Sequence, residues 1–240
     1  MDISTRLIDY SHNNTELEGF FACEEASHGQ RPAVLIAHMW GGRVPFVDEK
    51  AQILADMGYA AMALDMYGKG VRGQTVEECS GLMTPFMEDR ALLQSRMKAG
   101  LDTLRAQPEV DPDRIVVIGY CFGGLCALDL ARTGANIAGV VSFHGLLSAP
   151  CNTDGIAIKA TVLVLHGDKD PMAPVEQVAA LREEMTQAGA DWQLHLYGNT
   201  LHAFTNPAAN DHNLGTVYNE LADRRSWQTF QQFLAEVIPL

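Results

Sequence analysis

The chain has 240 residues, of which 47% are hydrophobic and 20% charged, a composition typical of a globular protein that buries a sizeable core. Its formal net charge of −13 argues against nucleic acid or an anionic membrane surface as a partner. No apolar run reaches the length of a membrane span, about 18 residues, and we expect neither a membrane segment nor a signal peptide.

The cysteines are too scattered for a disulfide framework or a structural zinc site. They stand at positions 23, 79, 121, 126 and 151, and no pair has the C-x-x-C spacing. Free thiols persist in a reducing compartment, so we expect a cytoplasmic protein. We also expect one domain over residues 1–240, as a monomer or a small homo-oligomer.

The predicted elements begin with an antiparallel hairpin, residues 5–10 and 15–23, joined around Asn13-Asn14. Beyond it, apolar runs bounded by turn residues alternate with longer stretches of helical spacing. Further strands are predicted at 33–38, 59–65, 114–119, 137–143, 160–167 and 191–197. Helices are predicted over 45–57, 88–105, 123–132, 174–188 and 216–236.

This alternation predicts an α/β fold with a parallel sheet that helices cover on both faces. Runs such as 33–38 are apolar without interruption, as in strands buried on both faces. Ligands of such sheets bind beyond the carboxyl ends of the strands. Polar or reactive residues follow several predicted strands at that edge, namely His38, Asp65, Cys121 and His166-Gly167-Asp168.

The segment GYCFGG, residues 119–124, places a thiol between glycines where a strand meets a helix. Free cysteine is often a buried small residue, and we interpret the other cysteines in that way. A core residue does not need glycines on both sides, whereas a nucleophile on a cramped strand-to-helix turn does. The following helix favours a thiolate at Cys121, and the N–H of Phe122 is placed to stabilise an oxyanion. We therefore interpret Cys121 as a nucleophile.

A thiol nucleophile needs a base, because a free thiol has a pKa of about 8.5 and is mostly protonated at neutral pH. On turns of this kind the partners follow in the order nucleophile, acid, histidine. Downstream, LVLHGDKDPMAP offers Asp168 and Asp170 after one strand, and GNTLHAFTNP offers His202 after the next. Order and position alone leave both carboxylates as candidates for the acid.

The chain resembles the dienelactone hydrolase family of the α/β-hydrolase fold. The resemblance covers nearly its whole length, through VLIAHMWGG, GYAAMALDMYGKG, IGYCFGG, LHGDKDPMAP, LHAFTNP and YNELADRRSW. It implies an α/β-hydrolase fold, with a mostly parallel central sheet, helices on both faces and an N-terminal antiparallel hairpin. It also implies hydrolysis of a small ester or lactone through an acyl-thioester intermediate, without a cofactor.

The same resemblance implies roles for individual residues. The family acid follows its HG dipeptide by three residues, which selects Asp170 over Asp168, and the family histidine matches His202. The implied triad is Cys121, His202 and Asp170. The implied oxyanion hole consists of the backbone N–H groups of Phe122 and Trp40.

The resemblance fails at two positions. Dienelactone hydrolases carry a glutamate before the oxyanion residue, where this chain has Met39, and a substrate-binding arginine four residues after the histidine, where it has Asn206. Without that cation a carboxylate substrate loses its simplest compensation for desolvation, so we expect a neutral or weakly polar ester or lactone. The candidate pocket residues are His38, Met39, Trp40, Phe86, Phe122, His144, Phe204 and Asn206.

Two other functions remain open. Cys121 could serve in a redox protein, but such a function needs a resolving cysteine, and Cys126 lies on a different side of the helix. Alternatively, the chain could bind ligands with slow or no turnover, a function that Met39 allows. No set of histidines and carboxylates has metal-ligand spacing, so we expect no metal.

Overall fold

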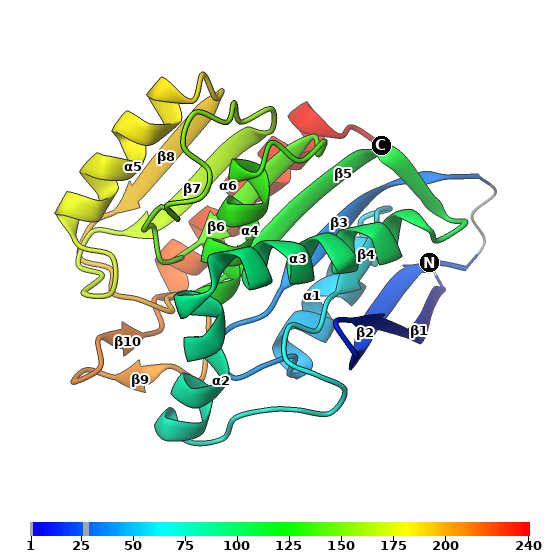
Figure 1. Ribbon diagram of the computed structural model, residues 1–240, viewed down its shortest axis with the longest axis horizontal. Helices are drawn as coiled ribbons and strands as arrows, with labels where there is room; N and C mark the ends of the chain where they lie inside the picture. The colour runs from blue at the N-terminus through cyan, green and yellow to red at the C-terminus, as the bar shows by residue number, and fades with distance from the viewer. Residues whose placement is uncertain (1, 26–28) are drawn as a thin grey trace.

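The computed structural model describes residues 2–25 and 29–240, and its centre is one mixed sheet (Figure 1). Eight strands of the described residues pair in the order β1-β2-β4-β3-β5-β6-β7-β8. Their bounds are Ile3–His12 (β1), Thr15–Glu24 (β2), Arg31–Ala37 (β3), Ala60–Ala63 (β4), Val110–Tyr120 (β5), Gly139–Phe143 (β6), Thr161–Gly167 (β7) and Trp192–Tyr197 (β8). A separate ribbon pairs β9 (Asn210–Asp211) with β10 (Thr216–Val217).

Strands β1 and β2 form the expected hairpin, and β2 also pairs antiparallel with β4. Asn13 and Asn14 make the turn, with φ angles of 49° and 59°. Two successive residues with positive φ give a tight turn whose twist matches that of the strands, and asparagine tolerates this backbone better than most residues. The N-terminal hairpin is therefore confirmed.

The rest of the sheet is parallel, from β4 and β3 through to β8. Strands β3, β6 and β7 are buried along nearly their whole length, as uninterrupted apolar runs predict. Because parallel strands end at one edge, the loops after β3, β5, β7 and β8 converge there. That edge carries the candidate functional residues.

Helices cover both faces of the sheet (Figure 1). The helices are α1 (Pro45–Asp56), α2 (Val76–Glu88), α3 (Arg90–Arg105), α4 (Phe122–Arg132), α5 (Val175–Gln187) and α6 (Glu220–Val237). Leu93, Leu125 and Leu181 bring α3, α4 and α5 into one buried cluster. Leu54 and Phe230 bring α1 and α6 into the cluster on the other face. The predicted three-layer arrangement is confirmed.

Helix α2 was not predicted from the sequence. Its N-terminus is a capping box, in which Thr75 accepts a hydrogen bond from the Glu78 N–H and Glu78 accepts one from the Thr75 N–H. The residues T-V-E-E carry this signal, but Pro85 inside the helix obscures it, because proline normally ends or kinks a helix. Strands β9 and β10 were also not predicted, and α6 begins four residues after the expected position 216.

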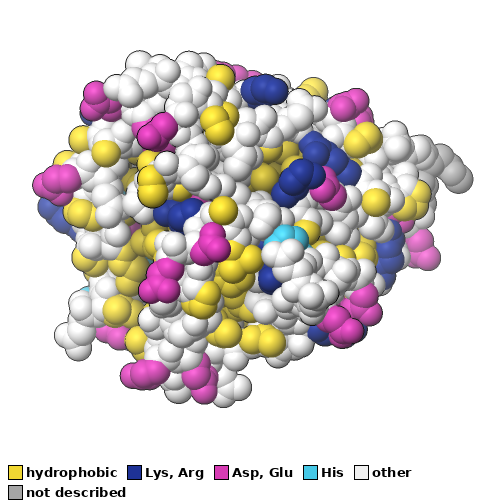
Figure 2. All heavy atoms as spheres, in the orientation of Figure 1, with side chains coloured by type: hydrophobic (Ala, Val, Ile, Leu, Met, Phe, Trp, Pro, Cys, Tyr) yellow, Lys and Arg dark blue, Asp and Glu magenta, His cyan; other side chains and the backbone are white. Residues whose placement is uncertain are grey.

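The side of the molecule that Figure 2 shows has no single acidic patch. Figure 2 shows Asp and Glu side chains scattered over the visible side, with Lys and Arg side chains among them. This distribution agrees with a solubilising role for the net charge of −13. Among the described residues, no helix has both the length and the apolar character that crossing a membrane requires.

Candidate active site

Cys121 occupies the sharp turn between β5 and α4. Its φ of 55° and ψ of −119° form a backbone conformation that residues other than glycine rarely adopt. Its N–H still bonds to the Phe143 carbonyl of β6, at 3.0 Å, so the sheet holds the residue up to the turn. Such strained backbone persists only where the surroundings enforce it, and it is frequent at functional sites.

The glycines around Cys121 are required by close backbone contacts. A Cβ at Gly119 would lie 1.9 Å from the carbonyl oxygen of Gly123, and a Cβ at Gly123 would lie 2.2 Å from that of Ala37. No side chain fits at these distances, so β5, the start of α4 and the end of β3 can meet only through glycine. The sequence pattern around the thiol thus has a steric cause.

The thiol lies in apolar surroundings, with 9% of the Cys121 residue surface exposed. It belongs to the same buried cluster as Phe86, Phe122 and Met66. Partly buried apolar side chains pack against this cluster from the neighbouring loops, Trp40 among them. The thiol is therefore nearly buried among apolar side chains.

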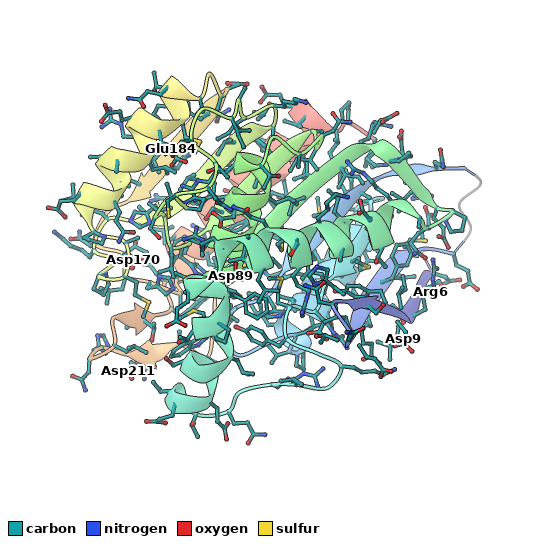
Figure 3. All side chains as sticks on the ribbon, viewed as in Figure 1. Arg6, Asp9, Asp89, Asp170, Glu184 and Asp211 are labelled. Atoms are coloured by element: carbon teal, nitrogen blue, oxygen red, sulfur yellow. The ribbon has the colours of Figure 1, made fainter. Side chains whose placement is uncertain are left out.

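His202 and Asp170 are brought together from the loops after β8 and β7. Nδ1 of His202 lies 2.7 Å from Oδ2 of Asp170, and the Met172 N–H donates to the other carboxylate oxygen at 2.8 Å. Both residues are buried, since Asp170 is 4% exposed and His202 is 1% exposed. Figure 3 labels Asp170 in the loop beyond β7, close to the β9–β10 ribbon. The carboxylate is therefore placed to fix the tautomer and orientation of the imidazole.

The β9–β10 ribbon holds the backbone of His202. The His202 N–H donates to the Gly215 carbonyl, and the Val217 N–H donates to the His202 carbonyl, both at 3.0 Å. His202 therefore sits beside a short strand pair and not in an unsupported loop. No hydrophobic alternation marks these strands, which explains why the sequence does not predict them.

The charge of His202 is set by its neighbours. Burial lowers the pKa of the imidazole, but the negative charge of a Cys121 thiolate and the hydrogen bond to Asp170 outweigh it and raise the pKa from 6.5 to about 10. Nε2 of His202 has no well-formed hydrogen bond among the described residues. Catalytic hydrogen bonds are often long in ligand-free structures, so this nitrogen is available to a thiol or a substrate.

Asp168, the other candidate acid, lies in a different environment. Its side chain is 46% exposed and lies 3.8 Å from the ammonium group of Lys169. Its N–H bonds to the Tyr197 carbonyl, which ties this end of the loop to β8. Of the two carboxylates, Asp170 is the one that contacts His202.

The N–H groups of Trp40 and Phe122 are both without a backbone acceptor in the described part of the chain. Phe122 is the first residue of α4, so its N–H has no partner within the helix. The two groups come from adjacent segments, because Gly123 packs against the backbone of Ala37 and His38. Two backbone N–H donors close to Cys121 are the arrangement that an oxyanion hole requires.

The other candidate pocket residues are mostly buried. His38, His144 and Phe204 have no exposed surface, and Phe86 is 7% exposed. Met39 and Asn206 are half-buried. The sequence can place a residue after a strand, but it does not show whether the side chain faces the opening or the core.

His144 lies against the candidate histidine. Its ring centroid is 5.2 Å from that of His202, and its Nε2 is 2.8 Å from Oγ1 of Thr205. Burial, together with the nearby charge of His202, holds the pKa of His144 well below its usual value. His144 is therefore a neutral ring that packs beside His202.

Tyr67, in the loop after β4, is a site residue that the sequence analysis misses. Its ring is stacked on Phe122 at a centroid distance of 6.0 Å, and its hydroxyl donates to the Trp40 carbonyl at 2.9 Å. The only signal for it is its position two residues after Asp65, at the edge where the strands end.

A surface cavity of about 550 Å³ lies between α5 and residues 149–158 and shares no lining residue with this site. Arg132 lines it, but its guanidinium nitrogens are bound to Asp129, Glu184 and the carbonyls of Leu147 and Ser148. No cluster of three or more His, Cys, Asp or Glu side chains suited to a metal ion occurs within the described residues.

Comparisons with a family model and with solved structures relate the chain to dienelactone hydrolases. The model of the dienelactone hydrolase family matches residues 17–238. The structure of a dienelactone hydrolase-like promiscuous phosphotriesterase from metagenomic libraries is 37% identical, with a TM-score of 0.93 over 98% of this chain and 99% of the other.

A curated relative from Bradyrhizobium sp. carries the name "Probable 2-oxo-3-(5-oxofuran-2-ylidene)propanoate lactonase". It is 27% identical over 209 residues, which cover 83% of this chain and 81% of the relative. A second structure, m3DLH, is 38% identical with a TM-score of 0.94, over 98% of this chain and 99% of the other. The similarity thus extends from the fold to nearly the whole sequence.

Proposed function

Because the chain belongs to the dienelactone hydrolase family, we propose that it hydrolyses small neutral esters or lactones with Cys121 as nucleophile. His202 is the general acid and base, and Asp170 orients its imidazole. The observation that carries the proposal is the buried 2.7 Å hydrogen bond between His202 and Asp170, together with a thiol on the strained turn between β5 and α4.

In the first half-reaction, the thiolate of Cys121 attacks the carbonyl carbon and forms a C–S bond. The carbonyl electron pair moves onto oxygen, where the N–H groups of Phe122 and Trp40 stabilise the charge. When the tetrahedral intermediate collapses, the leaving alkoxide takes the proton of the His202 imidazolium. The products are an acyl-thioester and an alcohol, which stays attached as a hydroxyl if the substrate is a lactone.

In the second half-reaction, the now neutral His202 takes a proton from water, and the hydroxide adds to the thioester carbonyl. Collapse of the second intermediate breaks the C–S bond and releases the acid. The proton that came from water remains on His202, so the thiolate–imidazolium pair is restored. Asp170 stabilises the imidazolium in both halves without taking its proton.

The surroundings of the thiol favour a neutral substrate. Met39 stands where relatives have a glutamate, and it packs against the buried clusters on both faces of the sheet. Asn206 stands where they have an arginine, and its side-chain oxygen Oδ1 accepts a hydrogen bond from the N–H of Ala208 at 3.0 Å. Neither side chain supplies a cation, so a substrate carboxylate would lose its hydration without a charged partner.

The test of the nucleophile is acylation by p-nitrophenyl acetate. We expect a burst of p-nitrophenol followed by steady turnover, and an acetyl group on the peptide that contains Cys121. Cys121→Ser should lose most activity, because a hydroxyl needs a stronger base than a thiol. Cys151→Ser, at an exposed cysteine, is the matched control and should keep full activity.

The outcomes separate the rival functions. A burst without turnover would indicate a stalled acyl-enzyme, and no acylation at any concentration would indicate a binding protein. Unchanged activity in Cys121→Ser would show that another group is the nucleophile. Reversible oxidation of the thiol without acyl transfer would favour the redox function.

The test of the substrate class compares phenyl and naphthyl esters with lactones that carry a carboxylate. Higher kcat/KM for the neutral esters is expected, and a strong preference for the carboxylate-bearing lactones would reject this part of the proposal. A neutral aryl phosphotriester belongs in the same series, because a similar structure is described as a promiscuous phosphotriesterase.

A further inference from the structure

His38 is fully buried directly after β3, and both of its ring nitrogens have defined partners. The Met66 N–H donates to Nε2 at 3.1 Å, so Nε2 carries the lone pair. Nδ1 therefore carries the proton and donates it to the Met39 carbonyl at 2.6 Å. Burial lowers the pKa of His38, which keeps the ring neutral and preserves this tautomer.

The Met39 carbonyl belongs to the peptide whose N–H is that of Trp40. In a trans peptide the C=O and N–H point in opposite directions, so a donor that holds the carbonyl also aims the N–H. The Gly42 N–H reaches the same carbonyl at 3.1 Å and closes a tight turn. His38 thus holds the plane of the peptide that carries one of the two proposed oxyanion donors.

The next two carbonyls of this loop are also bound. The Tyr67 hydroxyl donates to the Trp40 carbonyl at 2.9 Å, and the Gly73 N–H donates to the Gly41 carbonyl at 3.0 Å. The Tyr67 ring stacks on Phe122, the residue that carries the other oxyanion donor. One side chain therefore contacts the segments of both donors.

We propose that His38 and Tyr67 are positioning residues that fix the loop of residues 39–41, so that the Trp40 N–H faces the oxygen of the tetrahedral intermediate. This inference rests on the proposed function. His38 acts through a hydrogen bond to one peptide, and Tyr67 acts through a hydrogen bond to the next. Neither side chain needs to touch the substrate.

Release of this loop should weaken the stabilisation of the transition state and leave substrate binding nearly unchanged. The oxyanion exists only after attack, so a misplaced N–H lowers kcat while KM changes little. Removing one oxyanion donor reduces kcat by about 100- to 1000-fold, and a misplacement of about 1 Å is worth about 100-fold. We therefore expect a loss of about 10- to 100-fold when the loop is released.

Two substitutions of His38 separate donation from simple filling of space. His38→Asn places an amide N–H near the position of Nδ1 and should keep most of kcat. His38→Gln places its amide near the position of Nε2, where it can still accept the Met66 N–H, but it leaves the Met39 carbonyl without the donor. His38→Gln should therefore lose about 10- to 100-fold in kcat.

Tyr67→Phe removes a single oxygen and keeps the ring against Phe122, so it carries the same test if the His38 variants fold poorly. It should also lose kcat at nearly constant KM, by about 10-fold or more. Tyr59→Phe is its matched control, because Tyr59 precedes β4 at the opposite edge of the sheet. His195→Asn, within β8, is the control for the histidine substitutions.

The decisive readout compares two reactions of the same thiol. Acylation by a p-nitrophenyl ester passes through an oxyanion, whereas alkylation by iodoacetamide displaces iodide and forms none. We expect His38→Gln and Tyr67→Phe to slow acylation by the amounts above and to change the alkylation rate less than about twofold. An aryl trifluoromethyl ketone, which forms a tetrahedral adduct with the thiol, should bind more weakly by the same factor as kcat falls.

Three results would overturn the inference. These are unchanged acylation in both variants, an equal loss of acylation and alkylation, or a loss in His38→Asn as large as that in His38→Gln. Failure of the proposed function is a different result, because then the unmodified protein would not be acylated at Cys121 at all.

Discussion

His202 offers the sharpest test of the site, because its predicted charge is opposite to that of an ordinary buried histidine. Burial lowers its pKa, yet the negative charge of a thiolate at Cys121 and the hydrogen bond to Asp170 would raise it from 6.5 to about 10. The difference of about 3.5 pH units corresponds to about 5 kcal/mol in favour of the imidazolium. Opposite charges in a poorly solvated site are the cause.

The perturbation that we choose is removal of the thiolate. In Cys121→Ala the largest effect that raises the pKa is absent while burial remains, so the pKa of His202 should fall by more than about one pH unit. Asp170→Asn removes the second effect and should also lower it. Cys151→Ala, at an exposed cysteine, should leave the pKa unchanged.

The same shift makes stability depend on pH. A raised pKa means that the folded protein holds the proton more tightly than the unfolded chain. The contribution of His202 is therefore fully present below pH 6.5 and is lost as pH rises through about 10. In Cys121→Ala the loss should again begin near pH 6.5, but it should be complete at a lower pH and be smaller. Urea denaturation across this range gives the free energies of unfolding.

The direct assay is NMR titration of the imidazole nitrogens of His202, with His202→Gln to identify its resonances among the 8 histidines. A titration near the ordinary pKa of 6.5 in the unmodified protein would refute the ion pair. So would a pKa in Cys121→Ala equal to that of the unmodified protein. Either result would mean that the thiol does not sustain the imidazolium.

Further predictions concern the glycines at the turn between β5 and α4, and the two candidate acids Asp168 and Asp170. Gly119→Ala places a Cβ 1.9 Å from the Gly123 carbonyl oxygen and should destabilise the fold by several kcal/mol, whereas Gly81→Ala, with open space around its Cβ, should be neutral or stabilising by about 0.5–1 kcal/mol. Thermal denaturation distinguishes them, and similar melting temperatures would contradict the steric argument. Asp170→Asn should reduce kcat by about 10⁴-fold, the loss known for a triad acid, while Asp168→Asn should stay within about twofold. Equal losses in steady-state ester hydrolysis would show that Asp170 has no special role.

Most of the fold could be predicted because its signals are local. The turn at Asn13-Asn14 and the apolar strands each carry their own pattern, and glycines on both sides of Cys121 predict the strand-to-helix turn there. Helix α2 was missed although its capping box is also local, because Pro85 argues against a helix. Local signals therefore fix an element only when they agree with one another.

By itself, the sequence determined the α/β class, the edge at which the candidate residues gather, and the identities of Cys121 and His202 as candidates. Only the tertiary structure decided which residue of the β7 loop meets the imidazole, since Asp168 and Asp170 lie two positions apart and face different surroundings. It also placed the buried ring of His38 in hydrogen bonds to the Met39 carbonyl and the Met66 N–H, which the sequence does not reveal. The reason is physical: the direction of a side chain after a strand depends on partners from distant segments, here the loops after β4 and β8, and the neighbouring residues do not encode these partners.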